Sequence, residues 1–352
     1  SDQEGYTELK GLSYLNLLRK LDLEVEFLDA QLAQEFFSCF SCPFGLEQLK
    51  LHFHYIANEH RSKDPNNKKE SGEHSIETLN NPHSHRFFAQ LRNIDHLQEL
   101  SLTAGFLNPQ YIWKDFVYEI FKCLSSPGAI SLTCFTDEIP KRFIPKSEEN
   151  GHAISLSHLY TLNPRVFQHI KKFSIAGELL SLEGLDSNSD FKISKLEVLT
   201  LEGDIIGAAG FPKLISLFKG FKNPPFCSTH KFSVGTIQTQ SLQELFDCLG
   251  ALKSCANWNG EVSLAANDID KGDFLTIVID FINSVKQEYT LPLHFMYKYL
   301  YEQELNMLGE ALLESGYFTQ ISISNNSTIT LLGQKDKFSL NINETGDFQE
   351  IN

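Results

Sequence analysis

The sequence predicts an α/β solenoid of about ten strand-plus-helix repeats, each about 29 residues long. A parallel sheet would line its concave side, and the helices would cover its convex side. Three observations predict this fold: an apolar motif that recurs along the chain, the regular spacing of its copies, and amphipathic helical stripes between them.

The repeated motif has the form Leu-x-x-Leu-x-Leu, with other apolar residues allowed at the Leu positions. Clear copies begin at Leu46, Leu97, Ile170 and Leu196, and the copy from Phe318 also keeps a terminal Asn326. Seven of the nine spacings between successive copies fall between 26 and 33 residues, and the two longer ones indicate insertions. The central apolar residues are Leu21, Leu49, Leu100, Ile130, Phe173, Leu199, Phe232, Val262, Leu293 and Ile321.

The segments between the motifs are predicted to be amphipathic helices. In the clearest one, apolar residues from Leu242 to Leu252 step by three and four, and Ser241 with Glu244 predicts a capping box at its start. Similar stripes run through Leu32, Phe36 and Phe40, through Ile112, Phe116, Ile120 and Leu124, through Leu214, Phe218 and Phe221, and through Phe274, Ile277, Val278 and Phe281.

This alternation over about residues 16 to 326 resembles the ribonuclease-inhibitor-like subclass of the leucine-rich-repeat superfamily. The predicted organisation is an N-terminal cap or its remnant over 1–15, followed by a solenoid over 16–327 with insertions at about 58–85 and 136–151. A C-terminal hairpin cap and acidic tail would occupy 328–352, with hairpin strands at 328–332 and 338–342.

Composition limits the class of partner. The 352 residues carry a formal net charge of −15, which repels phosphate backbones and anionic membrane surfaces, so we expect no nucleic-acid partner. No apolar run reaches the roughly 20 residues of a membrane span. The 7 cysteines, an odd number, favour reduced thiols in a cytosol over a disulfide framework.

Two features invite a metal or redox interpretation, and we favour a structural one for both. His60, His74, His83 and His85 lie in the first insertion, where His-x-His spacing can chelate, but a polar surface loop with incidental histidines is the better reading. The Cys39-x-x-Cys42 pair lacks a second pair at zinc-ribbon spacing. No phosphate loop, nucleophile elbow or His-Glu-x-x-His motif is present, so we expect no enzyme activity, no cofactor and no metal site.

Side-chain alternation predicts which strand residues face the concave surface. The central column is mostly Ser and Thr, and the next column is mostly small, so the middle of this face should have low relief with larger groups at its ends. Cross-strand hydrogen bonding within a crowded sheet explains the Ser and Thr column at least as well as partner binding does. A rim near Phe135 and Phe143, or the second insertion, offers another contact surface. The candidate protein-binding residues are Lys50, His52, Ser101, Thr103, Ser131, Thr133, Ser174, Thr200, Glu202, Ser233, Ser263, His294, Met296 and Ser322.

The expected function is a non-enzymatic protein–protein interaction scaffold. The degenerate repeats, abundant Phe and acidic tail resemble leucine-rich-repeat effectors of intracellular bacterial pathogens. That resemblance implies a role in virulence and host–pathogen interaction, with a host protein as the partner and secretion into the host cell cytosol. Two alternatives stay open: a regulator of a GTPase or another enzyme, since Ran-GTPase activators use the same repeat subclass, and a bacterial cytosolic interaction protein.

Overall fold

The structure is a computed structural model, and it describes residues 7–27, 30–55, 82–105, 109–125, 127–135, 153–187, 191–193, 195–219, 231–255, 258–266, 268–285, 291–297, 300–315, 320–325 and 327–332. The chain forms two compact units. Unit 1 comprises Ser1–Leu179 with Lys192–Leu196, and unit 2 comprises Leu180–Phe191 with Glu197–Asn352.

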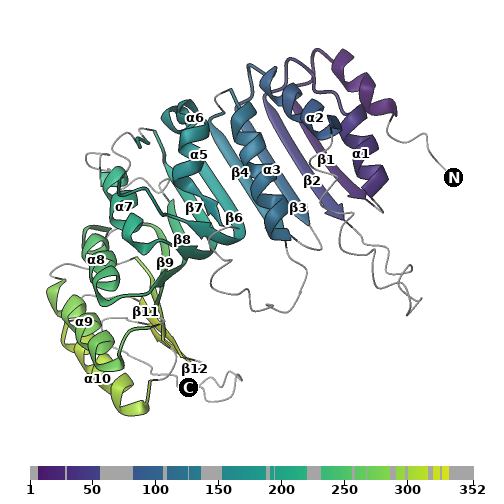
Figure 1. Ribbon diagram of the computed structural model, residues 1–352. Coiled ribbons are helices and arrows are strands. Elements are labelled where there is room, and N and C mark those ends of the chain that lie inside the picture. Colours follow the sequence, from purple (N-terminus) through teal and green to yellow (C-terminus); the bar gives the residue numbers. More distant parts are fainter. Residues whose placement is uncertain are drawn as a thin grey trace, which may run out of the picture. The chain divides into compact units, whose positions relative to one another are not determined.

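Strands and helices alternate along unit 1 (Figure 1). The elements are η1 (Thr7–Tyr14), β1 (Lys20–Phe27), α1 (Ala30–Cys39), β2 (Gln48–Tyr55), α2 (Pro82–Arg92), β3 (Glu99–Gly105), α3 (Pro109–Cys123), β4 (Ala129–Phe135), β5 (Ile154–Ser155), α5 (Leu156–Leu162), α6 (Pro164–His169) and β6 (Lys172–Ser181). Helices α2, α3 and α6 each begin at a proline, whose fixed φ suits the first helical position. Strands β1, β2, β3, β4 and β6 pair in that order, all parallel.

Unit 2 repeats the alternation. Its elements are β7 (Val198–Ile206), η3 (Ala208–Gly210), α7 (Phe211–Lys219), β8 (Lys231–Thr239), α8 (Leu242–Leu252), η4 (Lys253–Cys255), β9 (Gly260–Ala266), α9 (Lys271–Ser284), β10 (Leu293–Tyr297), α10 (Glu302–Ser315), β11 (Gln320–Asn325) and β12 (Ser327–Leu332). Strands β7 to β11 are parallel neighbours in chain order, and β12 pairs antiparallel with β11.

Within each unit the helices lie over one face of the strands, and the core fills the space between the two layers (Figure 1). Aromatic rings connect the layers: Phe36 of α1 meets Phe53 of β2 edge-to-face, with ring centroids 5.6 Å apart. In unit 2, Phe274 of α9 meets Phe295 of β10 in the same way. Many of the phenylalanine side chains therefore lie in the core. There, edge-to-face ring pairs bury apolar area with favourable geometry.

All ten central apolar residues of the predicted motif lie in the parallel strands. In unit 1 the register pairs Leu21, Leu49, Leu100, Ile130 and Phe173 in succession, as their spacing predicts. These strand–helix units are compatible with a repeat solenoid. Among the helices that the structure describes, none is both long and apolar enough to cross a membrane.

Three sequence predictions need correction or qualification at the level of elements. Residues 83 and 85 lie in the first turn of α2, so the first insertion ends before them. The strand at 327–332 pairs with β11, so it extends the sheet, and the other predicted hairpin strand at 338–342 lies outside the described residues. In α8, Ser241 accepts a hydrogen bond from the Glu244 amide, but the Glu244 carboxylate accepts from Gln240 rather than from Ser241.

Candidate binding face

The strand face opposite the helices is the candidate binding face, and we call it the helix-free face. Alternation along β2 shows how it arises: Leu49 and Leu51 point into the core and are fully buried, while Lys50 and His52 point the other way and are half-exposed. The same alternation holds along β4, where Ile130 is buried and Ser131 is half-exposed.

In unit 1 the register aligns every predicted site residue as expected. Lys50, Ser101, Ser131 and Ser174 pair in one column across β2, β3, β4 and β6. The second column contains His52, Thr103, Thr133 and Ala176. Thr103 is only 9% exposed and Ala176 only 7%, so in the second column only His52 and Thr133 present half-exposed side chains.

Charged groups gather at the β1 end of this face. Lys50 Nζ lies 4.0 Å from the Glu99 carboxylate, and His52 Nε2 lies 3.7 Å from Asp22 on the neighbouring strand. These groups are substantially exposed, so each pair contributes little to stability. Their arrangement instead places the Lys50 ammonium and the His52 imidazole among carboxylates at the β1 end of the face, where a partner can recognise them.

In unit 2 the register differs from the prediction. Thr200 pairs with Ser233 as expected, but Ser233 then pairs with Glu261 rather than with Ser263. A bulge between Val234 and Thr236 shifts the register, and Thr236 becomes the neighbour of Ser263. Beyond the bulge the predicted column resumes through Ser263, His294 and Ser322.

Around the bulge, the predicted binding residues differ in how far their side chains are exposed. Ser233 is only 6% exposed, and its hydroxyl donates to the Glu261 carboxylate at 3.2 Å. Thr200, Ser263 and His294 are half-exposed, while Glu202 and Met296 are exposed. Ser322 lies in β11, and its side chain is outside the described part of the chain.

Four residues of this face escaped sequence reasoning. Glu261 stands opposite Ser233, and Thr236 stands opposite Ser263 with its hydroxyl 3.7 Å from the Met296 sulfur. Asp204 accepts a hydrogen bond from Gln238 at 3.2 Å. The signal that could have located them is a glycine inside each strand pattern, Gly203 and Gly235, since an isolated glycine in a strand suggests a bulge.

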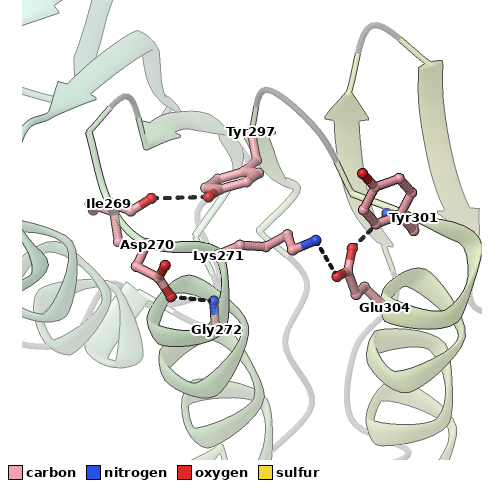
Figure 2. A network of polar contacts seen from close by, with 7 residues as sticks. All are labelled: Ile269, Asp270, Lys271, Gly272, Tyr297, Tyr301 and Glu304. Atoms are coloured by element: carbon pink, nitrogen blue, oxygen red, sulfur yellow. Dashed lines mark hydrogen bonds and ion pairs between the residues drawn. The ribbon is translucent and has the colours of Figure 1, made fainter.

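A polar network lies where β9 and β10 lead into α9 and α10 (Figure 2). Lys271 at the start of α9 forms an ion pair with Glu304 of α10 at 2.5 Å and lies 4.3 Å from the centroid of the Tyr301 ring. Tyr297 donates to the carbonyl of Ile269 at 2.9 Å, and its ring stacks on Phe274. The hydrogen bond to Glu304 raises the pKa of Lys271, so the ammonium stays charged. The ion pair between Lys271 and Glu304 joins α9 to α10, and the Tyr297 hydrogen bond joins β10 to the segment before α9, so the network links successive strand–helix units.

The thiols are arranged as structural groups. Burial raises the pKa of Cys42 to about 12, and Cys39 at the end of α1 is half-exposed. Cys134 and Cys248 likewise have pKa values of about 12, each raised chiefly by burial. Thiols held protonated in this way are poor nucleophiles. Within the described residues there is no group of three or more His, Cys, Asp and Glu side chains placed to hold a metal ion.

Neither known family models nor curated proteins match this chain. Its function is therefore inferred from its own side chains. The helix-free face can donate and accept hydrogen bonds through hydroxyls and can form ion pairs at the β1 end of unit 1. Both are properties of a recognition surface.

Proposed function

We propose that this chain is a non-enzymatic protein-interaction module that binds its partner on the helix-free face. The observation that carries the proposal is the difference between the two faces of the parallel strands. One face is covered by helices, and the other presents half-exposed polar side chains in both units.

Parallel sheets are usually covered on both faces, and their strands are then apolar on both sides. Here the strands alternate instead, with Leu100 and Leu102 fully buried on the helix side and Ser101 half-exposed on the other. A parallel sheet that tolerates water on one face is typical of repeat solenoids, which use that face to bind partners. We therefore also propose that the successive strand–helix pairs are leucine-rich repeats of about 29 residues arranged as a horseshoe.

The side chains of the face indicate how a partner would bind. Ser131 of β4 and Ser174 of β6 are neighbours on this face in unit 1, and small side chains let a partner's backbone approach the sheet. The charged groups at the β1 end, Lys50 and Asp22, would select among partners, because charge complementarity contributes more to specificity than to affinity. In unit 2, the exposed Met296 offers an apolar contact beside the Thr236 hydroxyl.

We further propose, on the family resemblance alone, that the chain is a secreted bacterial effector whose partner is a host protein. This part is tested separately, by following a tagged chain from the bacterium that encodes it into infected cells. Detection in the host cytosol is expected. Retention inside the bacterium would reject the effector role while leaving the interaction role intact.

The binding face is tested by affinity capture from eukaryotic cytosol, identification of the captured protein, and measurement of Kd with the purified partner. One variant carries Ser131→Arg and Ser174→Arg in unit 1, and another carries Thr200→Arg in unit 2. An arginine in the middle of a contact surface blocks close approach, so at least one variant should weaken binding by tenfold or more, about 1.4 kcal/mol.

Matched controls place the same arginine on the helices, as Thr161→Arg on α5 for unit 1 and Ser216→Arg on α7 for unit 2. Both positions are exposed, so folding is retained. If the controls weaken binding and the face variants do not, the partner binds the helix side and the proposed surface is wrong. If the partner is chemically changed by catalytic amounts of the chain, the non-enzymatic assignment is wrong.

A further inference from the structure

The core of unit 1 is incompletely covered at its first strand. Leu21 and Leu23 of β1 are half-exposed, whereas their register partners Leu49 and Leu51 on β2 are fully buried. Among the described residues, β2 is the only strand that pairs with β1, and η1 packs against α1 in the helix layer. A solenoid end with an open apolar column needs a cover.

Four large apolar side chains are exposed in the two segments that lead into β1 and β2. Tyr14 is 84% exposed and Leu17 is 89% exposed in the segment that leads into β1, and Leu15 and Phe44 are exposed with them. The two segments are held together because Arg19 donates to the carbonyl of Gly45 at 2.8 Å and the Glu47 amide donates to Arg19 at 2.8 Å. Large exposed apolar side chains on two segments that are bonded together favour an interaction surface.

We propose that this surface is a homodimer interface in which β1 pairs antiparallel with β1 of a second copy. The argument for a second copy is the charge pattern of the strand itself. In a two-fold antiparallel pair centred on Asp22, Lys20 faces Glu24 of the second copy, and this happens twice. On the core side, Leu21 faces Leu23 of the second copy, also twice, so the half-exposed leucines cover one another.

The exposed fractions agree with this register. Lys20 and Glu24 are both exposed and share the helix-free side of β1, while Leu21 and Leu23 share the other side. Tyr14, Leu15, Leu17 and Phe44 adjoin the strand and add the apolar area that a stable interface needs beyond one strand pair. The same carboxylates, Asp22 and Glu24, repel an anionic membrane from this edge.

This register brings two like charges close together. The two Asp22 carboxylates meet at the two-fold axis, and His52, 3.7 Å from Asp22, lies beside each of them. Asp22→Asn removes the repulsion and keeps the shape, so this variant should dimerise more tightly than the wild type.

The test is analytical ultracentrifugation of the whole chain over a range of concentrations, with the mass compared with two copies of 40.0 kDa. The wild type should form dimers. Lys20→Glu alone and Glu24→Lys alone should each raise the dimer Kd about tenfold, because either change turns two attractive pairs into two repulsive ones. The double variant with both changes restores opposite charges across the axis, so its Kd should return toward the wild-type value.

Controls reverse charges on elements of unit 2, as Lys253→Glu in η4 and Glu310→Lys in α10, both at exposed positions. These should leave the dimer Kd unchanged, and circular dichroism verifies that all variants fold. A chain that stays monomeric at every concentration overturns the proposal and assigns the surface to a different partner. A dimer that ignores the single reversals, or a double variant no better than either single one, also overturns it.

Discussion

Gln90 shows how one side chain can join two segments that are far apart in sequence. Its Oε1 accepts from the Cys42 amide at 2.8 Å, and its Nε2 donates to the Phe40 carbonyl at 2.7 Å. The amide thereby satisfies two backbone groups just after α1, where helix ends leave carbonyls unpaired. Because both the donor and the acceptor of the amide are used, neither an acid nor an apolar residue can replace it.

Gln90→Met should lower the free energy of unfolding by about 2 kcal/mol, because it keeps the volume of the side chain and leaves two part-buried backbone groups without partners. Urea denaturation followed by circular dichroism measures the change. Gln243→Met is the control, since its amide donates only to the exposed Asp247 carboxylate on the same helix. Equal effects at the two positions would show that the bridge at Gln90 contributes nothing.

Strand alternation predicts the direction of a side chain but not how much of it stays exposed. Lys50 and Ser131 are half-exposed as alternation predicts. Thr103 is buried despite lying on the same face. Ser233 is also buried, and its neighbour Glu261 receives its hydrogen bond. Exposure depends on the neighbours across the sheet, and a single sequence does not contain that information.

The bulge in β8 is the element that sequence spacing missed. Spacing assumes one residue opposite one residue, and a bulge places an extra residue on one strand. The register shifts between Leu201 and Asp204 where β7 meets β8, and again between Val234 and Thr236 where β8 meets β9. A Cβ on Gly235 would lie 2.4 Å from the Gly203 carbonyl oxygen, so only glycine allows the two backbones to approach this closely.

Gly235→Ala should therefore destabilise the chain by about 2 kcal/mol, because the added methyl forces the strands apart. Gly250→Ala is the matched change in α8, where a Cβ would meet nothing within 4 Å. That variant should stabilise by about 0.5–1 kcal/mol through helix propensity. Thermal or urea unfolding of both variants tests the signs, and a Gly235→Ala chain as stable as the wild type would contradict the close approach.

At the scale of the whole molecule, the sequence is most informative about the positions of the repeated strands. The apolar positions from Leu21 to Ile321 predict the ten parallel strands found among the described residues, because each repeat must bury the same column of side chains. The ends were harder to predict, because an end has no following repeat to constrain it. The strand at 327–332 pairs antiparallel with β11, and the hairpin expected between it and residues 338–342 stays a prediction, because those residues lie outside the described part of the chain.

The buried thiols predict how the stability of the molecule changes at alkaline pH. Burial raises the pKa of Cys42 and of Cys248 from 9.0 to about 12. Between these values the unfolded chain loses thiol protons that the folded chain keeps, so ionisation favours the unfolded state. Stability should therefore be unaffected by these thiols below pH 9 and should fall above it, by about 1 kcal/mol per pH unit for each buried thiol.

Urea unfolding at several pH values above 8 measures this slope, and substitution isolates the thiol contribution. Cys248→Ala removes one ionising group and should reduce the slope, whatever the cost of the lost volume. Val278→Ala in α9 truncates another fully buried side chain without removing a thiol, so it should lower stability equally at every pH. Lysine and tyrosine titration affects all three chains alike, so the difference between the slopes belongs to Cys248. Identical slopes in the wild type and Cys248→Ala would mean that water reaches this thiol in the folded chain.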